Sequence, residues 1–288
     1  VVACTLDRYI TEDLEADHLF LDEVGYASLM KALPLFRQNK PVTFLGDHLQ
    51  LPPVCEVTEL GRNSTYDKLV LWAESAIYAG CMFKSGMTVQ SLLENYLRDR
   101  HDRIPEMKKM ELNTTFRFPA NLAALLDKYV YKNGFHSNLD RREMELTCLN
   151  AVKDTNDLRR TSLNEVVAIR RYLTENAGRL GSYVILTPYR KQLDLLGKYM
   201  PEERKDMNIL TVHKSQGREW DTVILSVVDT RDMWFSDSKN RISRGLNVLN
   251  TAISRAKKRI VIACDRSYWI TQRGQLLSEI VRTCNCNK

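Results

Sequence analysis

Residues 18–25 read His-Leu-Phe-Leu-Asp-Glu-Val-Gly, and residues 42–53 read Val-Thr-Phe-Leu-Gly-Asp-His-Leu-Gln-Leu-Pro-Pro. Each stretch is a short apolar run that ends in an acidic residue, which is typical of a buried strand in a parallel sheet. Between them, residues 27–38 have a helical pattern that Pro34 is expected to kink. Since strands joined by a helix are usually parallel, the sequence predicts a β-α-β unit with both acids at one sheet edge.

The rest of the chain extends this alternation of strands and helices, and the predicted fold class is α/β with parallel sheets. Further strands are predicted at residues 1–5, 182–187, 209–212, 222–228 and 260–264. Helices are predicted at residues 119–131, 163–175 and 245–258, and a loop-rich stretch at 137–160. We expect two domains, residues 1–111 with a helical insertion at 55–111, and residues 112–288.

Composition narrows the classes of protein that the chain can represent. The net charge of +6 suits a polyanion partner but does not identify one. Seven cysteines, an odd number, argue against a secreted disulfide framework and favour the cytoplasm, or the nucleus in a eukaryote. No apolar run approaches the roughly 20 residues that cross a bilayer, so no membrane partner is predicted. The absence of an initiator Met suggests a fragment.

The acidic strand ends carry the first candidate chemistry. Asp22 can hold Mg²⁺, and Glu23 beside it can orient and deprotonate a water molecule, as in P-loop NTPases. A solvent-exposed strand end without function would look the same. Gln50 is an uncharged donor and acceptor that suits a γ-phosphate or a lytic water. Yet the phosphate loop pattern G-x-x-x-x-G-K-[ST] occurs nowhere in the 288 residues.

Two later stretches offer groups for a phosphate or a sugar. Residues 211–221 have a polar centre with Gln216, Gly217 and Glu219, although a solvated connecting loop would also be polar. Residues 244–259 form a basic stretch with an apolar stripe at helical spacing. Arg255 is expected to project away from that stripe, free to neutralise a transferring phosphoryl group or simply to end the helix with a positive charge.

The chain resembles the C-terminal part of superfamily 1 helicases. Within them it is most similar to the branch of the nonsense-mediated-decay RNA helicase, the immunoglobulin-mu-binding protein and the replication nuclease–helicase. The resemblance rests on seven segments in the family's order, at residues 3–5, 22–25, 46–50, 115–119, 187–192, 212–221 and 247–255.

The resemblance implies two RecA-like domains of the P-loop NTPase type, the first incomplete, with ATP and Mg²⁺ as cofactors. It implies that Asp22 is the Walker B metal ligand and Glu23 the catalytic base. Gln50, Arg117 and Arg255 are implied to contact the γ-phosphate. Further nucleotide contacts are implied for Asp47, Phe116, Gln216, Gly217 and Glu219. The segments with Thr5, Thr187, Pro188 and His213 are implied to line a nucleic-acid track.

The sequence therefore predicts the C-terminal part of an ATP-dependent helicase or translocase acting on single-stranded DNA or RNA. Its phosphate loop is expected in a missing N-terminal part of the same protein, so the isolated chain is expected to have little ATPase activity. The alternative is a non-catalytic nucleic-acid-binding or scaffolding module that kept a helicase fold, which the intact candidate catalytic residues disfavour. A nuclease subunit is a third possibility, but no clustered acidic nuclease motif is visible.

Overall fold

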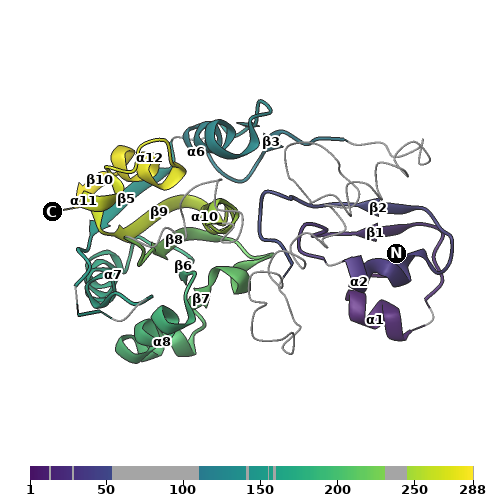
Figure 1. Cartoon of the computed structure of the whole chain (residues 1–288), viewed down its shortest axis with the longest axis horizontal. Coiled ribbons are helices and arrows are strands. Elements are labelled where there is room, and N and C mark those ends of the chain that lie inside the picture. Colours follow the sequence, from purple (N-terminus) through teal and green to yellow (C-terminus); the bar gives the residue numbers. More distant parts are fainter. Residues whose placement is uncertain are drawn as a thin grey trace, which may run out of the picture. The chain divides into compact units, whose positions relative to one another are not determined.

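The structure is a computed structural model that divides into two compact units, unit 1 (Val1–Glu111) and unit 2 (Leu112–Lys288) (Figure 1). It describes residues 1–12, 14–27, 29–53, 110–140, 143–154, 156–157, 160–230 and 245–287. The helical insertion predicted at residues 55–111 lies outside the described residues, apart from the last two positions. No described helix is both long enough and apolar enough to cross a membrane.

Unit 1 contains the β-α-β unit that the sequence predicts. Strands β1 (Leu19–Leu21) and β2 (Val42–Phe44) pair in parallel. The connecting helix α2 (Leu29–Ala32) continues as a 3₁₀ turn, η1 (Leu33–Phe36), whose first turn contains Pro34. Proline cannot donate a backbone hydrogen bond, so Pro34 explains why the α-helix changes to a 3₁₀ turn at this point.

The strand predicted at residues 1–5 is wrong, since this segment has no strand and leads into helix α1 (Leu6–Thr11). Thr5 caps that helix, and its side-chain oxygen accepts a hydrogen bond from the backbone N of Arg8 at 3.2 Å. Threonine is a favoured N-cap residue, and Asp7 adds a negative charge in the first turn. The signals that decide this segment are therefore Thr5 and Asp7, which mark the start of a helix.

Unit 2 is built on a six-stranded parallel sheet with the strand order β10-β5-β9-β8-β6-β7. Its strands are β5 (Glu145–Asn150), β6 (Tyr183–Thr187), β7 (Ile209–Thr211), β8 (Trp220–Ser226), β9 (Ala256–Cys264) and β10 (Asn285–Asn287). The central strands β6, β8 and β9 carry runs of fully buried aliphatic residues, as expected for a sheet that is covered on both faces. The predicted α/β class with parallel sheets is confirmed.

Helices cover both faces of this sheet (Figure 1). Helices α7 (Leu163–Asn176) and α8 (Arg190–Tyr199) share one apolar core with Ile185, Ile224 and Val261 of the central strands. Helices α10 (Gly245–Ile253) and α12 (Leu276–Thr283) contact the sheet through β8, β9 and β5. The remaining helical segments are α6 (Ala120–Leu126), η2 (Asp127–Tyr131), α9 (Pro201–Lys205), η3 (Val212–Ser215) and α11 (Arg266–Trp269).

Two predictions for unit 2 are wrong. The stretch expected to be loop-rich, residues 137–160, contains β5, whose four central residues are buried between polar ends. The helix predicted over residues 245–258 ends at Ile253, and β9 begins at Ala256. The basic residues at the start of β9 are accommodated in a strand because acidic side chains flank them, as Glu145 does for Arg259 at 2.7 Å.

Candidate functional sites

In unit 1, the carboxyl ends of β1 and β2 remain bonded to each other beyond the strands. The backbone N of Leu45 donates to the carbonyl of Leu21 at 2.8 Å, and the backbone N of Val24 donates to the carbonyl of Leu45 at 2.9 Å. Asp22 directly follows one strand and Asp47 lies in the loop after the other, so both belong to the same sheet edge.

Two glycines permit this close approach of the loops. A Cβ atom at Gly25 would lie 2.5 Å from the carbonyl oxygen of Asp47, and one at Gly46 would lie 2.7 Å from the backbone N of Val24. Both distances are too short for any other residue without a shift of the backbone. The turn at Gly46 is visible in the sequence, but the need for Gly25 appears only once the loops are seen to touch.

Local hydrogen bonds hold the polar side chains of this edge. Oδ1 of Asp22 accepts from the backbone N of Glu23 at 2.8 Å, and Glu23 has a left-handed backbone with φ of 54°. Asp47 accepts from the backbone N of Leu49 at 2.8 Å through Oδ1, and from Nε2 of Gln50 at 3.0 Å through Oδ2. Asp47 therefore orients Gln50, a role that the sequence did not suggest.

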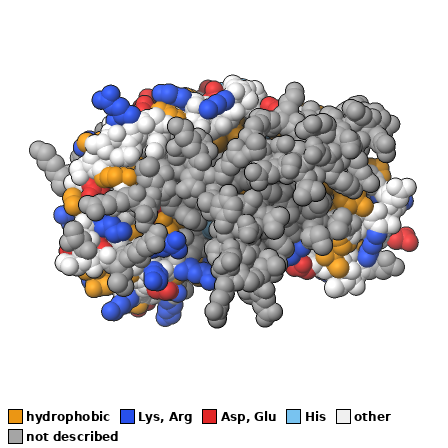
Figure 2. All heavy atoms as spheres, in the orientation of Figure 1, with side chains coloured by type: hydrophobic (Ala, Val, Ile, Leu, Met, Phe, Trp, Pro, Cys, Tyr) orange, Lys and Arg blue, Asp and Glu red, His pale blue; other side chains and the backbone are white. Residues whose placement is uncertain are grey.

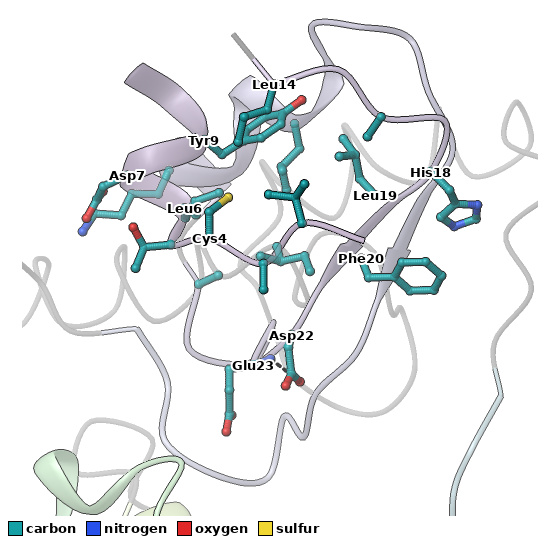
Figure 3. Close-up of a pocket in the computed structure, with 18 of the residues that line it drawn as sticks. Cys4, Leu6, Asp7, Tyr9, Leu14, His18, Leu19, Phe20, Asp22 and Glu23 are labelled. Atoms are coloured by element: carbon teal, nitrogen blue, oxygen red, sulfur yellow. Dashed lines mark hydrogen bonds between the residues drawn. The ribbon is translucent and has the colours of Figure 1, made fainter. Parts of the chain in front are cut away.

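A cavity of about 930 Å³ lies beside this edge within unit 1. Asp22 and Glu23 lie at one end of it, away from Tyr9 and Leu14 (Figure 3). Thr5 also lines the cavity, while its hydroxyl caps α1. The carboxylate oxygens of Asp22 and Glu23 are the kind of ligand that Mg²⁺ takes when phosphates complete its coordination, so the residues fit that ion. Among the described residues, no group of three or more metal-ligating side chains forms a site by itself.

In unit 2, we call the beginnings of β8 and β9 the amino edge of the sheet, with Arg117, Glu219 and Lys257 as its charged residues. Nε of Arg117 lies 3.0 Å from Oε2 of Glu219, and Nη1 donates to the carbonyl of Ser254 at 3.3 Å. Lys257 pairs with Oε1 of the same carboxylate. These two cations, Lys257 first, hold the pKa of Glu219 below its usual value.

Arg255 belongs to the same amino edge, but its environment differs from the expectation. The side chain is only 3% exposed, and its carbonyl accepts a hydrogen bond from the backbone N of Trp220 at 3.0 Å. The expectation that it projects freely from a helix was wrong, because α10 ends at Ile253 and helical periodicity does not extend to Arg255.

The other residues implied in nucleotide contacts lie near these in sequence. Phe116, next to Arg117, is 68% exposed. Gly217, two residues before Glu219, has φ of 72°, and a Cβ there would meet no atom within 4 Å. Gln216 is half-buried. The structure thus brings together Arg117, Glu219 and the turn containing Arg255, with Phe116 and Gly217 as sequence neighbours.

The opposite edge, where β6 and β7 end, holds residues implied in nucleic-acid contacts, and we call it the carboxyl edge. Thr187 pairs in register with Thr211, but its side chain is fully buried and Oγ1 accepts from the backbone N of Tyr189 at 3.4 Å. Pro188 is half-buried. His213 is also half-buried, and burial together with the charge of Arg190 lowers its pKa. The imidazole is therefore neutral at pH 7.

Helix α8 begins beside this carboxyl edge and carries exposed basic residues. Arg190 and Lys191 stand in its first turn, and Lys198 in its last. Figure 2 shows Lys and Arg side chains gathered over the part of unit 2 where Figure 1 places α8. Clustered positive charge of this kind attracts the phosphates of a nucleic acid.

Sequence reasoning missed a buried acid at the carboxyl edge. Glu165 is only 2% exposed, and it accepts from Oγ of Ser226 at 2.6 Å and from the backbone N of Val228 at 2.8 Å. Burial raises the pKa of Glu165 to about 8, so the carboxyl group is neutral at pH 7. Glu165 stands three residues after the N-cap Ser162, which matches the capping-box pattern. That pattern does not indicate that the glutamate is buried.

Comparison with known proteins gives several relatives that are named as helicases. A family model described as "AAA domain" matches residues 150–267. The chain is 23% identical to "Uncharacterized ATP-dependent helicase MJ0104" of Methanocaldococcus jannaschii, over 95% of the chain and 39% of the relative. It is 27% identical to "DNA replication ATP-dependent helicase/nuclease DNA2" of Gallus gallus, over 86% of the chain and 23% of the relative. It is 23% identical to "Regulator of nonsense transcripts 1 homolog" of Neurospora crassa, over 80% of the chain and 21% of the relative.

The chain thus spans about two fifths or less of the length of these curated relatives. Among solved structures, "The structure of PRRSV helicase" matches with a TM-score of 0.45 and 21% identity, over 89% of the chain and 37% of that structure's chain. By the names of these curated relatives and the matched family model, the chain is similar to superfamily 1 helicases, in the branch of the nonsense-mediated-decay and replication nuclease–helicase proteins, as the sequence resemblance indicated.

Proposed function

We propose that the chain is part of an ATP-dependent helicase or translocase that couples ATP hydrolysis to movement on single-stranded DNA or RNA. The relatives support an ATP-dependent, helicase-like function in general. The observation that carries the finer proposal is the bonded pair of strand ends in unit 1, which assembles Asp22, Glu23, Asp47 and Gln50 at one edge. The proposal places the protein where nucleic acid is found, in the cytoplasm or, in a eukaryote, in the nucleus.

In unit 1, Asp22 would hold a nucleotide-bound Mg²⁺, which supplies positive charge to the phosphates when bound. Glu23 would take a proton from the attacking water, since it stands beside Asp22 on a strained, left-handed backbone of the kind found at functional sites. Asp47 would hold Gln50 by the hydrogen bond at 3.0 Å, so that the amide of Gln50 faces the γ-phosphate.

In unit 2, we assign the amino edge to the nucleotide and the carboxyl edge to the nucleic acid. Arg117 and Arg255 would stabilise charge on the transferring phosphoryl group. Phe116, exposed beside Arg117, would stack on the base. We also retain Gln216, Gly217 and Glu219 as nucleotide contacts.

At the carboxyl edge, Pro188 and His213 would contact the nucleic-acid strand directly. Thr187 would act through the backbone of its turn, because its side chain is buried. In unit 1, Thr5 would contact the nucleic-acid strand. Aromatic and uncharged contacts of this kind tolerate any base sequence, as a translocating motor requires.

A phosphate loop is needed to complete the nucleotide site, and the 288 residues contain no G-x-x-x-x-G-K-[ST] pattern. We propose that another part of the same protein supplies it. On this proposal, residues 1–288 alone have little ATPase activity, because the lysine and backbone amides that cradle the β- and γ-phosphates are missing.

The test is the ATPase activity of the complete protein with and without single-stranded nucleic acid, for the wild type and for Glu23→Gln. The wild type should be stimulated by the strand. Glu23→Gln should lower kcat by at least about 100-fold while leaving ATP binding within about twofold, since a general base contributes to turnover and not to binding. Glu12→Gln is the matched control, because Glu12 forms a surface ion pair with Arg8 in the same unit.

Strand-stimulated turnover that survives Glu23→Gln would remove Glu23 from the proposed role. A wild-type protein that binds the strand but never hydrolyses ATP would instead favour the non-catalytic nucleic-acid-binding module.

A further inference from the structure

We infer that Lys257 is a positioning residue for Arg117, which it holds in place through their shared partner Glu219. The inference rests on the proposed function, in which Arg117 contacts the nucleotide phosphates. It adds Lys257, which lies beyond the segments that carry the helicase resemblance. It also gives Glu219 a structural role besides contact with the nucleotide.

The backbone of the amino edge fixes the two residues that hold Arg117. Trp220 of β8 pairs in register with Ala256 of β9, and its backbone N donates to the carbonyl of Arg255 at 3.0 Å. Glu219 precedes Trp220 and Lys257 follows Ala256, so the two side chains start from neighbouring, hydrogen-bonded strand ends. Lys257 pairs with Oε1 of Glu219, and Arg117 lies against Oε2 at 3.0 Å.

The backbone around Arg117 is held independently of this cluster. The backbone N of Arg117 donates to Oγ1 of Thr115 at 3.2 Å. The next residue, Phe118, is 3% exposed, and its carbonyl accepts from Oγ of Ser137 at 2.7 Å. With the backbone fixed, the direction of the Arg117 side chain depends on its contacts with Glu219 and the carbonyl of Ser254. Within the described part of the chain these contacts use Nε and Nη1, so the donors of Nη2 can bind a phosphate.

Charge gives Lys257 a second effect. One carboxylate is shared by two cations, so the cluster of Arg117, Glu219 and Lys257 keeps a net charge of about +1 at neutral pH. Without Lys257, the Arg117–Glu219 pair would be neutral and would attract a phosphate less. The partial exposure of all three side chains makes this attraction moderate and sensitive to salt.

The next residue along β9 forms a different arrangement and provides a matched control. Nζ of Lys258 lies 2.7 Å from Oδ1 of Asp221, while Oδ2 of Asp221 accepts from the backbone N and the hydroxyl of Ser182 at 3.2 and 3.1 Å. Lys258 therefore also joins the start of β9 to the start of β8 by an ion pair, but its acidic partner holds a serine instead of a catalytic arginine.

The experiment compares Lys257→Met with Lys258→Met in the complete protein, measuring kcat and KM for ATP at saturating single-stranded nucleic acid. Lys257→Met should lower kcat by about tenfold, the size expected when a partner of a catalytic group is lost, with KM within about twofold. Lys258→Met should keep wild-type kcat. Lys257→Arg, which restores the cation, should recover at least half of the wild-type kcat.

A second comparison separates positioning from direct contact. If Lys257 acts through Arg117, Lys257→Met should add little to the loss that Arg117→Ala already causes. Full multiplication of the two losses would show that Lys257 contacts the phosphate itself, and equal kcat for the two Lys→Met variants would show a purely structural role. Either outcome overturns the inference. A wild-type protein without strand-stimulated ATPase would instead contradict the proposed function.

Discussion

The two edges of the unit 2 sheet are built in opposite ways. At the amino edge, Arg117, Glu219 and Lys257 remain partly exposed, and the two cations share the carboxylate of Glu219. At the carboxyl edge, the carboxyl group of Glu165 is buried and neutral, and it accepts hydrogen bonds from Ser226 and Val228. The seven residues of β8 separate these edges by about 20 Å at 3.3 Å per residue.

On the proposed function, this difference would let one sheet serve two ligands. The exposed cations of the amino edge suit a site where the charge on a phosphate changes during a reaction. The buried hydrogen bonds of the carboxyl edge suit a surface that must keep its shape while a strand moves along it. Gln192 extends this buried network, since its Nε2 donates to the hydroxyl of Ser226 and to the carbonyl of Ser162, each at 3.0 Å.

The largest expected effect is at the amino edge. Arg117→Ala in the complete protein should lower kcat for ATP by about 1,000-fold, because an arginine that stabilises the transferring phosphoryl group contributes at least that much. Affinity for single-stranded nucleic acid should stay within about threefold, which fluorescence anisotropy measures. Arg170→Ala, an exposed arginine of α7, is the control for losing one positive charge. A large loss of strand affinity in Arg117→Ala would break the separation of the two edges.

The second effect concerns stability at the carboxyl edge. Because the pKa of Glu165 is raised to about 8 in the folded protein, the folded state keeps a proton that the unfolded chain loses above about pH 4.5. The stability from this group is fully present below about pH 4.5 and is lost as the pH rises toward 8. Glu165→Gln, which mimics the neutral acid, should remove a pH-dependent term of roughly 3–5 kcal/mol.

Chemical denaturation at pH 5, 6.5 and 8, followed by tryptophan fluorescence, checks this prediction. Glu175→Gln is the matched control, since Glu175 lies on the same helix but is exposed beside Arg171. If Glu165→Gln and the wild type lose stability in parallel with rising pH, the carboxyl group of Glu165 is ionised in the folded state. That result would contradict the prediction.

A third prediction tests whether single-stranded nucleic acid binds at the carboxyl edge. His213→Ala should weaken binding of single-stranded nucleic acid by about tenfold, the loss expected when one ring that stacks on a base is removed. The kcat for ATP at saturating strand should remain within about twofold of wild type. Since the pKa of His213 is lowered, its contribution to binding should not change between pH 7 and 8. A fall in kcat without a change in the affinity for single-stranded nucleic acid would show that His213 acts in ATP turnover and not in nucleic-acid binding.

The smallest effect is in the loop that joins the two edges. Gly217→Ala introduces a side chain where φ is 72°, which costs about 1 kcal/mol of backbone strain although the space is open. Gly178→Ala, in the turn after α7, meets equally open space without a left-handed backbone, so it should cost less or even stabilise the protein by restricting the unfolded chain. A difference in thermal midpoint of a few degrees is expected between the two variants. Equal midpoints would show that the loop relaxes freely.

The sequence predicts the parts of this fold that local pattern determines. Apolar runs ending in Asp22 and Asp47 predict parallel strands and a shared acidic edge, and the structure contains the strands. The strand β9 could not be predicted from its start, because Lys257 and Lys258 look like a solvated helical surface. Only the acids at the start of β8, which are distant in sequence, make a strand favourable there.

Burial of polar groups is the other feature that the sequence could not show. Arg255 was expected on an exposed helix face, but a turn beginning at Ser254 takes it out of the helical repeat and into a buried position. Glu165 stands where a capping residue is normally exposed, and only the carboxyl end of β8, packed over it, makes it a buried acid. Both results depend on contacts between elements far apart along the chain.

The most direct test of separate edges is hydrogen–deuterium exchange of the complete protein with one ligand at a time. Single-stranded nucleic acid alone should slow exchange at residues 187–191 and 211–215, at the ends of β6 and β7. A non-hydrolysable ATP analogue alone should slow exchange at residues 116–119 and 217–220, beside Arg117 and Glu219. Protection of the same segments by both ligands, or the reverse pattern, would contradict the account.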